Sequence, residues 1–198
     1  TGSNTTIVGA GTTTVTVTQA ADSNYNAATA TMTLTVNKAD LTITFDDLTK
    51  TYEDPDFNLV ATSSSTGAFT FNILDGNVAT VTGSITTIVG AGTTTVTVTQ
   101  EADSNYNAAT ATMTLTVNKA DHTITFDDLT KTYEDPGFNL VATSSSTGAF
   151  TFNIMDANVA SVTGSITTIV GAGTTTVTVT QVADANYNAA TATMTLTV

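Results

Sequence analysis

Apolar and polar residues alternate one by one along most of this chain, a pattern that is typical of β-strands with one buried face. Within residues 40–117, seven short runs show the alternation, at residues 41–45, 57–61, 69–73, 78–81, 85–89, 95–99 and 110–117. Clusters of Gly, Pro, Asp, Asn and Ser separate the runs, and these residue types favour turns. We therefore expect seven short strands and no long helix in this stretch.

The whole pattern returns every 81 residues, as the segment Thr-Gly-Ser at Thr1, Thr82 and Thr163 illustrates. A period of this length indicates one supersecondary unit copied in tandem. The copies predict one complete repeat at residues 40–117 and another at residues 121–198. Residues 1–36 match only the C-terminal half of a repeat, so we expect the chain to be a window from a longer protein.

Seven strands with one apolar face each predict two sheets packed face to face, as in an immunoglobulin-like β-sandwich. A small closed barrel is the alternative architecture. Thr supplies about a quarter of the residues, and its branched side chain suits a pleated, half-buried surface. The half repeat carries Asn4 where a complete repeat carries Ile85, so we expect Ile85 to face solvent and Ile88 to face the core.

Composition excludes several classes of partner. The chain has 17 acidic residues against four lysines and no arginine, which gives a net charge of −13. Such a charge repels nucleic acids and anionic membranes, and no apolar run is long enough to cross a bilayer, so we expect neither nucleic-acid binding nor membrane insertion. Without Cys, the fold depends on its apolar core and not on disulfides.

Several motifs resemble the immunoglobulin-like repeats of large bacterial surface adhesins, of the invasin and intimin type. They are Lys-Thr-Tyr at residues 50–52, Val-Ala-Thr-Val at 78–81, Gly-Ala-Gly-Thr at 90–93 and Asn-Tyr-Asn-Ala-Ala at 105–109. The resemblance implies an extracellular protein of the bacterial cell surface, in which the repeats form a stalk or filament. The glycine that commonly follows Lys-Thr-Tyr in such repeats is Glu53 here and Glu134 in the next copy, which leaves the turn type open.

Three loops have the opening spacing of a calcium site, and the first of them, in the half repeat, contains Asp22, Asn24 and Asn26. The candidate ligands in the complete repeats are Asp103, Asn105 and Asn107 in one copy, and Asp184, Asn186 and Asn188 in the next. Oxygen ligands at alternate positions suit Ca²⁺, the one cofactor that the sequence suggests. The same residue types build Asx turns without a metal, so both interpretations stay open. The acidic residues between Asp46 and Asp56 form a second calcium candidate.

No constellation points to an enzyme. His122 is the single histidine, and the sister repeat has Leu41 in its place. A nucleophile elbow, a phosphate-binding loop and a paired-carboxylate motif are all absent, so we expect a non-catalytic protein. Tyr106 and its copies Tyr25 and Tyr187 would serve either as a sugar-stacking platform or as anchors on the core.

The joint between repeats is short. Only residues 118–121, Asn-Lys-Ala-Asp, separate the predicted last strand of one repeat from the first strand of the next. Without Gly or Ser, this segment is unlike a flexible linker, so we expect repeats to stack end to end. Neighbouring repeats are then each other's main partners, with lateral self-association of chains into a fibre as a further hypothesis. The alternative function is a multivalent module that binds glycan or protein weakly and gains avidity by repetition.

Overall fold

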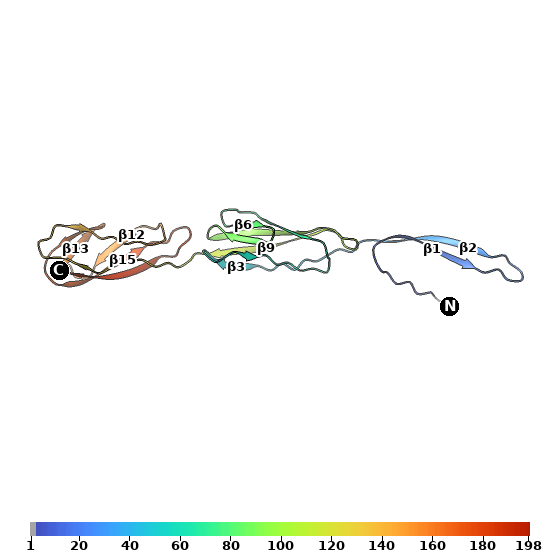
Figure 1. Cartoon of the computed structure of the whole chain (residues 1–198), viewed down its shortest axis with the longest axis horizontal. Helices are drawn as coiled ribbons and strands as arrows, with labels where there is room; N and C mark the ends of the chain where they lie inside the picture. Colours follow the sequence, from blue (N-terminus) through green and yellow to red (C-terminus); the bar gives the residue numbers. More distant parts are fainter. Residues whose placement is uncertain (1–2) are drawn as a thin grey trace.

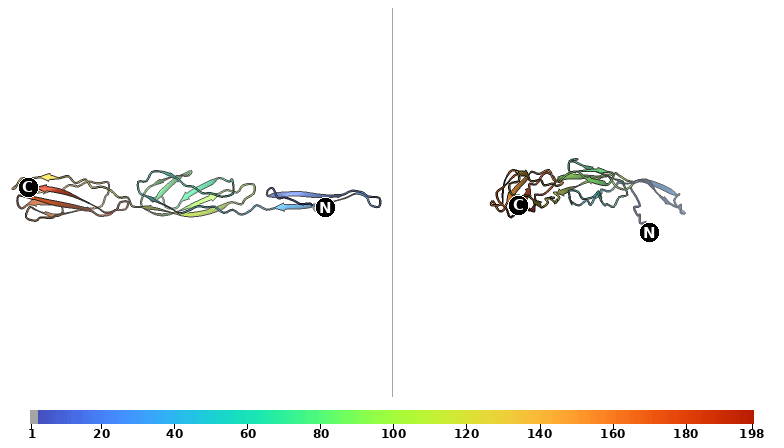
Figure 2. Two further views of the ribbon diagram at one scale, coloured as in Figure 1. Left: turned by 90° about the horizontal axis from the view of Figure 1, so that it is seen from below. Right: turned by 60° about the vertical axis from the view of Figure 1, so that its left-hand side comes forward.

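The computed structural model describes residues 3–198. Every regular element in that range is a β-strand, and none of it forms a helix long and apolar enough to cross a membrane. The strands make five sheets, which belong to one hairpin and two two-layered units. The three parts follow one another along a single long axis (Figures 1 and 2).

Seven strands build the middle unit. They are β3 (Leu48–Thr51), β4 (Phe57–Asn58), β5 (Phe69–Ile73), β6 (Ala79–Thr82), β7 (Ile85–Ile88), β8 (Gly92–Gln100) and β9 (Ala109–Asn118). One sheet has the order β3-β9-β8-β5 and the other has the order β4-β7-β6. All pairs are antiparallel except β3–β9, which is parallel.

The C-terminal unit repeats this arrangement strand by strand. Its strands are β10 (Leu129–Thr130), β11 (Phe138–Asn139), β12 (Phe150–Ile154), β13 (Ala160–Thr163), β14 (Ile166–Ile169), β15 (Thr174–Gln181) and β16 (Ala190–Thr197). Their sheets have the orders β10-β16-β15-β12 and β11-β14-β13. The N-terminal part is one antiparallel hairpin of β1 (Gly11–Gln19) and β2 (Ala28–Val36).

The strand order identifies the fold of each unit as an immunoglobulin-like β-sandwich, which the alternation predicted. In such a sandwich, strands A, B, E and D form one sheet and strands C, F and G form the other. Here β4, β7 and β6 lie in the order B, E, D, and an isolated bridge between Thr44 and Thr62 adds a fragment of strand A beside B. β5, β8 and β9 supply C, F and G. The two sheets are separate, so the closed barrel is wrong.

The core lies between the two sheets. In the middle unit, its fully or nearly fully buried residues are Leu59, Val78, Ala79, Val96, Met113, Leu115 and Val117, and the C-terminal unit buries an equivalent set. Alternate residues of β8 and β9 point inward, while the threonines between them cover the outer face. On β7, Ile85 is exposed and Ile88 packs against the core, as the Asn4 comparison predicted.

Five of the seven predicted strands are confirmed with small shifts at their ends. The run at 57–61 shortens to the two residues of β4. The run at 41–45 was predicted wrongly, because this segment makes only the bridge at Thr44 while it crosses from one sheet to the other. β3 is the strand that the pattern missed, and it lies in the acidic stretch that was expected to be a loop.

Candidate functional site

The loops with calcium-like spacing form turns around a single aspartate. Asp103 Oδ1 accepts hydrogen bonds from the backbone N–H groups of Asn105 and Tyr106, both at 2.8 Å. Its Oδ2 accepts from Ser65 Oγ at 2.8 Å and from the backbone and hydroxyl of Thr66. These bonds, first of all that from the Asn105 N–H, hold the pKa of Asp103 below its usual range. The carboxylate therefore ties its own turn to the loop at residues 63–67.

The C-terminal unit repeats this arrangement around Asp184. Its carboxylate accepts from the N–H groups of Asn186 and Tyr187 and from Ser146 and Thr147. The Thr147 N–H is the main cause that lowers the pKa of Asp184. In the hairpin, Asp22 makes the same two turn bonds, to the N–H groups of Asn24 and Tyr25. The turn is therefore a local property of the Asp-x-Asn-Tyr sequence.

The two asparagines of each loop point away from the aspartate. Asn105 Oδ1 accepts a hydrogen bond from the N–H of Ala10 at 2.9 Å, and Asn186 Oδ1 accepts one from the N–H of Ala91 at 2.9 Å. Both donors lie in the Gly-Ala-Gly turn of the preceding repeat. A Cβ on Gly9 would come within 2.9 Å of Asn105 Oδ1, so a side chain at this position would force the Asn105 side chain to shift. Asn105 and Asn186 therefore bind the neighbouring repeat.

The third residue of each loop binds the linker. Asn107 Nδ2 donates to Asp40 Oδ1 at 2.9 Å, and Asn188 Nδ2 donates to Asp121 Oδ1 at 2.8 Å. The three predicted calcium ligands of a loop thus have three different sets of partners and do not surround a common point. Across residues 3–198, no three His, Cys, Asp or Glu side chains gather as metal ligands usually do. Calcium binding stays a prediction for these loops.

The linker itself is hydrogen-bonded along its length. The backbone of Ala120 donates to Asn186 O and accepts from the N–H of Asn188, both at 2.9 Å, and Lys119 Nζ donates to Asp184 O. The preceding linker makes the same pair of backbone bonds, between Ala39 and the loop of Asn105 and Asn107. Each linker is therefore a short strand-like segment bound to the loop of the repeat that follows it.

Tyr187 adds an aromatic contact across the joint. Its ring meets Tyr52 of the preceding repeat edge to face, with ring centroids 5.4 Å apart, and lies 5.3 Å from the ring of His122. Its hydroxyl donates a hydrogen bond to the Glu53 carboxylate, which is the main cause that raises the pKa of Tyr187. Tyr187 is only 7% exposed, whereas the equivalent Tyr25 of the hairpin is 74% exposed. Tyr187 is thus a buried anchor, as one of the two alternatives expected, but its ring and hydroxyl also contact the preceding repeat, which the sequence did not predict.

Glu53 occupies an unusual backbone conformation. Its φ is 73°, and that of Glu134 is 77°, in the left-handed region that favours glycine. The turn that imposes this conformation is local: Asp54 Oδ2 accepts from the N–H of Thr51, and the N–H of Asp54 donates to the carbonyl of Thr51. A glutamate at this position places a carboxylate within reach of Tyr187.

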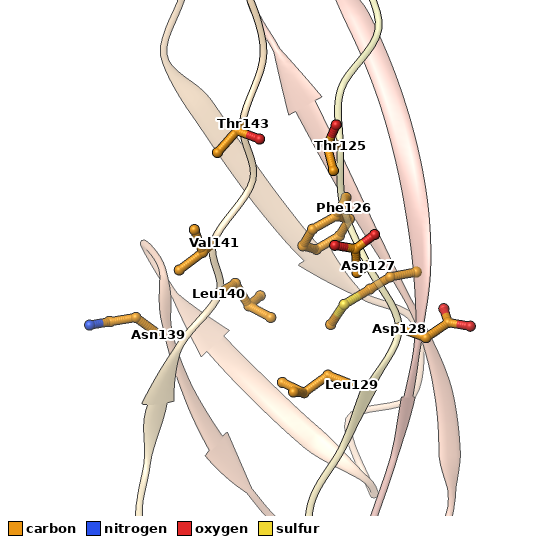
Figure 3. A pocket seen from close by; sticks show the side chains of 10 residues that line it. Thr125, Phe126, Asp127, Asp128, Leu129, Asn139, Leu140, Val141 and Thr143 are labelled. Carbon is orange, nitrogen blue, oxygen red and sulfur yellow. The ribbon is translucent and has the colours of Figure 1, made fainter.

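Each unit also has an open groove where the chain crosses between sheets. In the C-terminal unit, a groove of about 350 Å³ lies between residues 125–129 and 139–143. Figure 3 shows Phe126 and Leu140 pointing into it and Asp128 turned away, consistent with the hydrogen bond that Asp128 Oδ1 accepts from the N–H of Thr195 at 2.6 Å. The middle unit has the same groove at residues 44–48 and 58–62, also of about 350 Å³. Of the acidic residues in the predicted second calcium site, Asp46 and Asp47 thus border a groove with an apolar floor, whereas Asp54 binds the backbone of Thr51 and Glu53 binds Tyr187.

The sequence reasoning located the joint but missed most residues that form it. Glu53, Tyr52 and the backbone N–H of Ala91 belong to loops far from residue 187 in sequence, and periodicity does not report contacts between repeats. A partial sign was present, since Asn105 and the Gly-Ala-Gly turn are unchanged in all copies while Ser104 becomes Ala185 beside them.

Comparison with known proteins finds only distant matches among solved structures. No family model matches the chain, and no curated protein does. Among solved structures, the titin domains Z1Z2 in complex with telethonin match with a TM-score of 0.39 and 16% identity, over 82% of this chain and 98% of that chain. Drosophila N-cadherin EC1-3 matches with a TM-score of 0.31 and 10% identity, over 88% and 74%. A SusE-like surface-located polysaccharide-binding protein of Bacteroides thetaiotaomicron matches with a TM-score of 0.28 and 13% identity, over 92% and 37%.

Proposed function

We propose that this chain is part of the stalk of a bacterial cell-surface adhesin, in which tandem immunoglobulin-like repeats hold binding modules away from the cell. The observation that carries this proposal is the bonded joint at residues 118–121. A linker held by backbone hydrogen bonds, an asparagine bond to the preceding repeat and an aromatic contact resists bending in several directions. The elongated arrangement of the three parts (Figure 1) agrees with this role. The motifs that resemble adhesin repeats support the extracellular, cell-surface location.

The distribution of distances across the joint tests this proposal. Because the chain has no Cys, spin labels can be attached at introduced cysteines, Thr70→Cys and Thr151→Cys, on exposed positions of the two units. We expect a narrow distance distribution in the parent chain and a broader one after Asn186→Ala or Tyr187→Phe. Tyr133→Phe, at an exposed tyrosine away from Glu53, is the matched control and should leave the width unchanged. A broad distribution in the parent chain would mean a slack linker and would exclude a stiff stalk.

A second candidate function is weak multivalent binding at the repeated groove. The supporting observation is that both units have a groove of the same size, with an apolar floor and an aspartate rim. Binding of glycans or peptides to the two-unit chain should then fall after Asn139→Ala or Asp127→Ala, on the groove rim, and fall further when Asn58→Ala or Asp46→Ala is added. Lack of binding to arrays of both ligand classes would leave the stalk as the better proposal.

A further inference from the structure

Strand β11 has an edge that is only partly paired. At one end of that edge, Thr143 exchanges two backbone hydrogen bonds with Thr125, at 2.8 and 3.1 Å. Beyond Thr125 the chain leaves this sheet and continues as β10, which pairs with β16 in the opposite sheet. Because backbone groups alternate in direction along a strand, the N–H and C=O of Val141 and Asn139 point the same way as those of Thr143. Within residues 3–198 no backbone group pairs with Val141, so this part of the edge is open.

The groove described above lies beside this open edge. Its walls, residues 125–129 and 139–143, start at the Thr125–Thr143 bridge, where neighbouring strands are typically about 4.8 Å apart. They end in different sheets, and packed sheets are about 10 Å apart, so the groove widens from one end to the other. The wide end has room for one further extended chain against β11. Buried apolar residues, among them Phe126, Leu140 and Met194, form its floor.

One carboxylate at the rim indicates the charge of a suitable ligand. Figure 3 shows Asp127 on the groove side of its chain and Asp128 on the other side, where it accepts the N–H of Thr195. In the described part of the chain, Asp127 has neither a hydrogen bond nor an ion pair, and Lys131 of the same unit lies over the ring of Phe138 instead, 4.9 Å from its centroid. A net charge of −13 attracts cationic segments and repels acidic ones. The groove therefore favours an apolar side chain next to a positive charge.

The middle unit repeats each of these features. Its chain makes the same bridge at Thr44, the groove beyond the bridge also measures about 350 Å³, and Asp46 takes the place of Asp127. Val60 is 72% exposed and Val141 is 73% exposed, so the outward side of both edges is bare. An open strand edge beside an apolar pocket suits the addition of a peptide strand, in which main-chain bonds give affinity and the pocket gives specificity.

We propose that each groove binds an extended segment of another protein as an additional antiparallel strand on β4 or β11, with an apolar side chain on the floor and a neighbouring Lys or Arg paired with Asp46 or Asp127. The added strand continues the direction of strand A along the part of the edge that strand A leaves open. Because both grooves are on one chain, two such segments of one partner bind with avidity. The inference rests on the second candidate function, whose ligand class it names, and it is independent of the stalk proposal.

Methionine methyl NMR of the full 198-residue chain tests the inference, because Met113 and Met194 each line one groove whereas Met155, which is 76% exposed, lines neither. The probes are three pools of soluble heptapeptides in which apolar residues alternate with Thr and one Thr is replaced by Lys, Gln or Glu. The Lys pool should shift the signals of Met113 and Met194 and leave that of Met155 in place. The Gln pool should bind about 3- to 5-fold more weakly, which is the contribution of one exposed ion pair, and the Glu pool should bind more weakly still.

A variant and a modified peptide test the two kinds of contact separately. Asp127→Asn should remove the preference for Lys over Gln at Met194, and the unchanged middle groove, reported by Met113, is the internal control. Val141 faces solvent and Leu140 faces the floor, so in antiparallel pairing the peptide residue opposite Val141 is a polar one, and its N–H points towards β11. N-methylation of the polar positions of the peptides should therefore abolish the shifts, whereas N-methylation of the apolar positions should preserve them. The protein itself stays unchanged in this comparison.

Several results would overturn the inference. One is the absence of shifts at Met113 and Met194 with millimolar Lys pool. Others are equal binding of the Glu pool, equal effects of the two N-methylated series, and a shift of Met155 as large as that of Met194. Oligosaccharides that shift Met194 where the Lys pool does not would also overturn it, but they would support the second candidate function as a glycan site. The spin-label distances judge the stalk proposal in every case.

Discussion

A buried hydroxyl in the core provides the sharpest test of the packing described above. Thr86 lies in the middle of β7 with its side chain fully buried, and its Oγ1 has no hydrogen-bond partner among the described residues. Its cross-strand neighbours are Phe57 of β4 and Val81 of β6, both of which pack against the core. Thr167 repeats the situation in the C-terminal unit. We expect Thr86→Val and Thr167→Val to stabilise their own units.

The magnitude follows from the surroundings of the hydroxyl. Valine has nearly the shape of threonine, so the replacement creates no cavity and removes only the unpaired polar group. An unsatisfied buried hydroxyl costs about 1–3 kcal/mol, and the added methyl group contributes up to about 0.8 kcal/mol. We expect a gain of about 1–3 kcal/mol in the free energy of unfolding. For a unit of this size, each kcal/mol raises the midpoint of thermal unfolding by about 4–8 °C.

Calorimetry of the single and double variants measures this gain, and hydrogen exchange followed by mass spectrometry assigns each transition to a unit. Thr87→Val, at the exposed neighbouring position, is the control and should change the free energy of unfolding by less than about 0.5 kcal/mol. The two buried sites lie in different units, so their effects should add. A loss of stability on Thr86→Val would refute the reasoning, because it would mean that the hydroxyl has a partner in solution that the structure lacks.

Three further predictions concern the turns and the loops. The pKa values of Asp103 and Asp184 are lower in the folded state than the value of about 3.9 in an unfolded chain, so their contribution to stability is present above about pH 4 and is lost as the pH falls further. Denaturant titrations across this range should show the free energy of unfolding fall with pH. The double variant Asp103→Asn with Asp184→Asn should make this dependence on pH less steep. A Cβ at Gly148 would lie 1.9 Å from the carbonyl oxygen of Val182, so Gly148→Ala should lower the thermal midpoint strongly, whereas Gly76→Ala, in open space and already Ala157 in the sister unit, should not. Calcium binding at the loops of Asp103 and Asp184 predicts that the thermal midpoint rises when a chelator is exchanged for calcium, and an unchanged midpoint would show that the hydrogen bonds of the two carboxylates, and not a metal ion, hold these turns.

The alternation of apolar and polar residues predicted most of the strands that bury one face, but it did not predict β3, whose sequence does not alternate. β5 and β9 have strict apolar–polar alternation and were predicted nearly to the residue. β3, at Leu48-Thr-Lys-Thr, has one inward apolar residue, and its formation depends on parallel pairing with β9 more than sixty residues later. The run at 41–45 alternates well but makes only one bridge, because the chain is crossing between sheets at that point. Whether β3 and the run at 41–45 form strands therefore depends on pairing with residues far away in the sequence, which the local pattern does not contain.

The candidate site shows a related limit. Asp103 and Asp184 were recognised as turn or metal residues, and the turn interpretation follows from local sequence alone, since Asp22 makes the same turn in the uncovered hairpin. The roles of Asn105 and Asn186 could not be predicted in the same way, because their oxygen atoms bind the preceding repeat. A pattern within one repeat contains no information about which loop the neighbouring repeat presents.

The hydrogen bonds at the joint also explain how short loops can determine how successive repeats are oriented relative to one another. The bonds Asn105–Ala10 and Asn186–Ala91 both join residues 95 positions apart, more than one repeat length, and both measure 2.9 Å. The same donor turn and acceptor loop therefore meet at successive joints, held in place by the Asp103 and Asp184 turns. When the same rotation and translation relate every pair of neighbouring repeats, the rotations at successive joints add up in one direction. The chain of repeats then follows one straight or helical path. A substitution at Asn186 changes this path only at one joint, whereas a change made in every copy of the Gly-Ala-Gly turn would alter the path of the repeats at every joint.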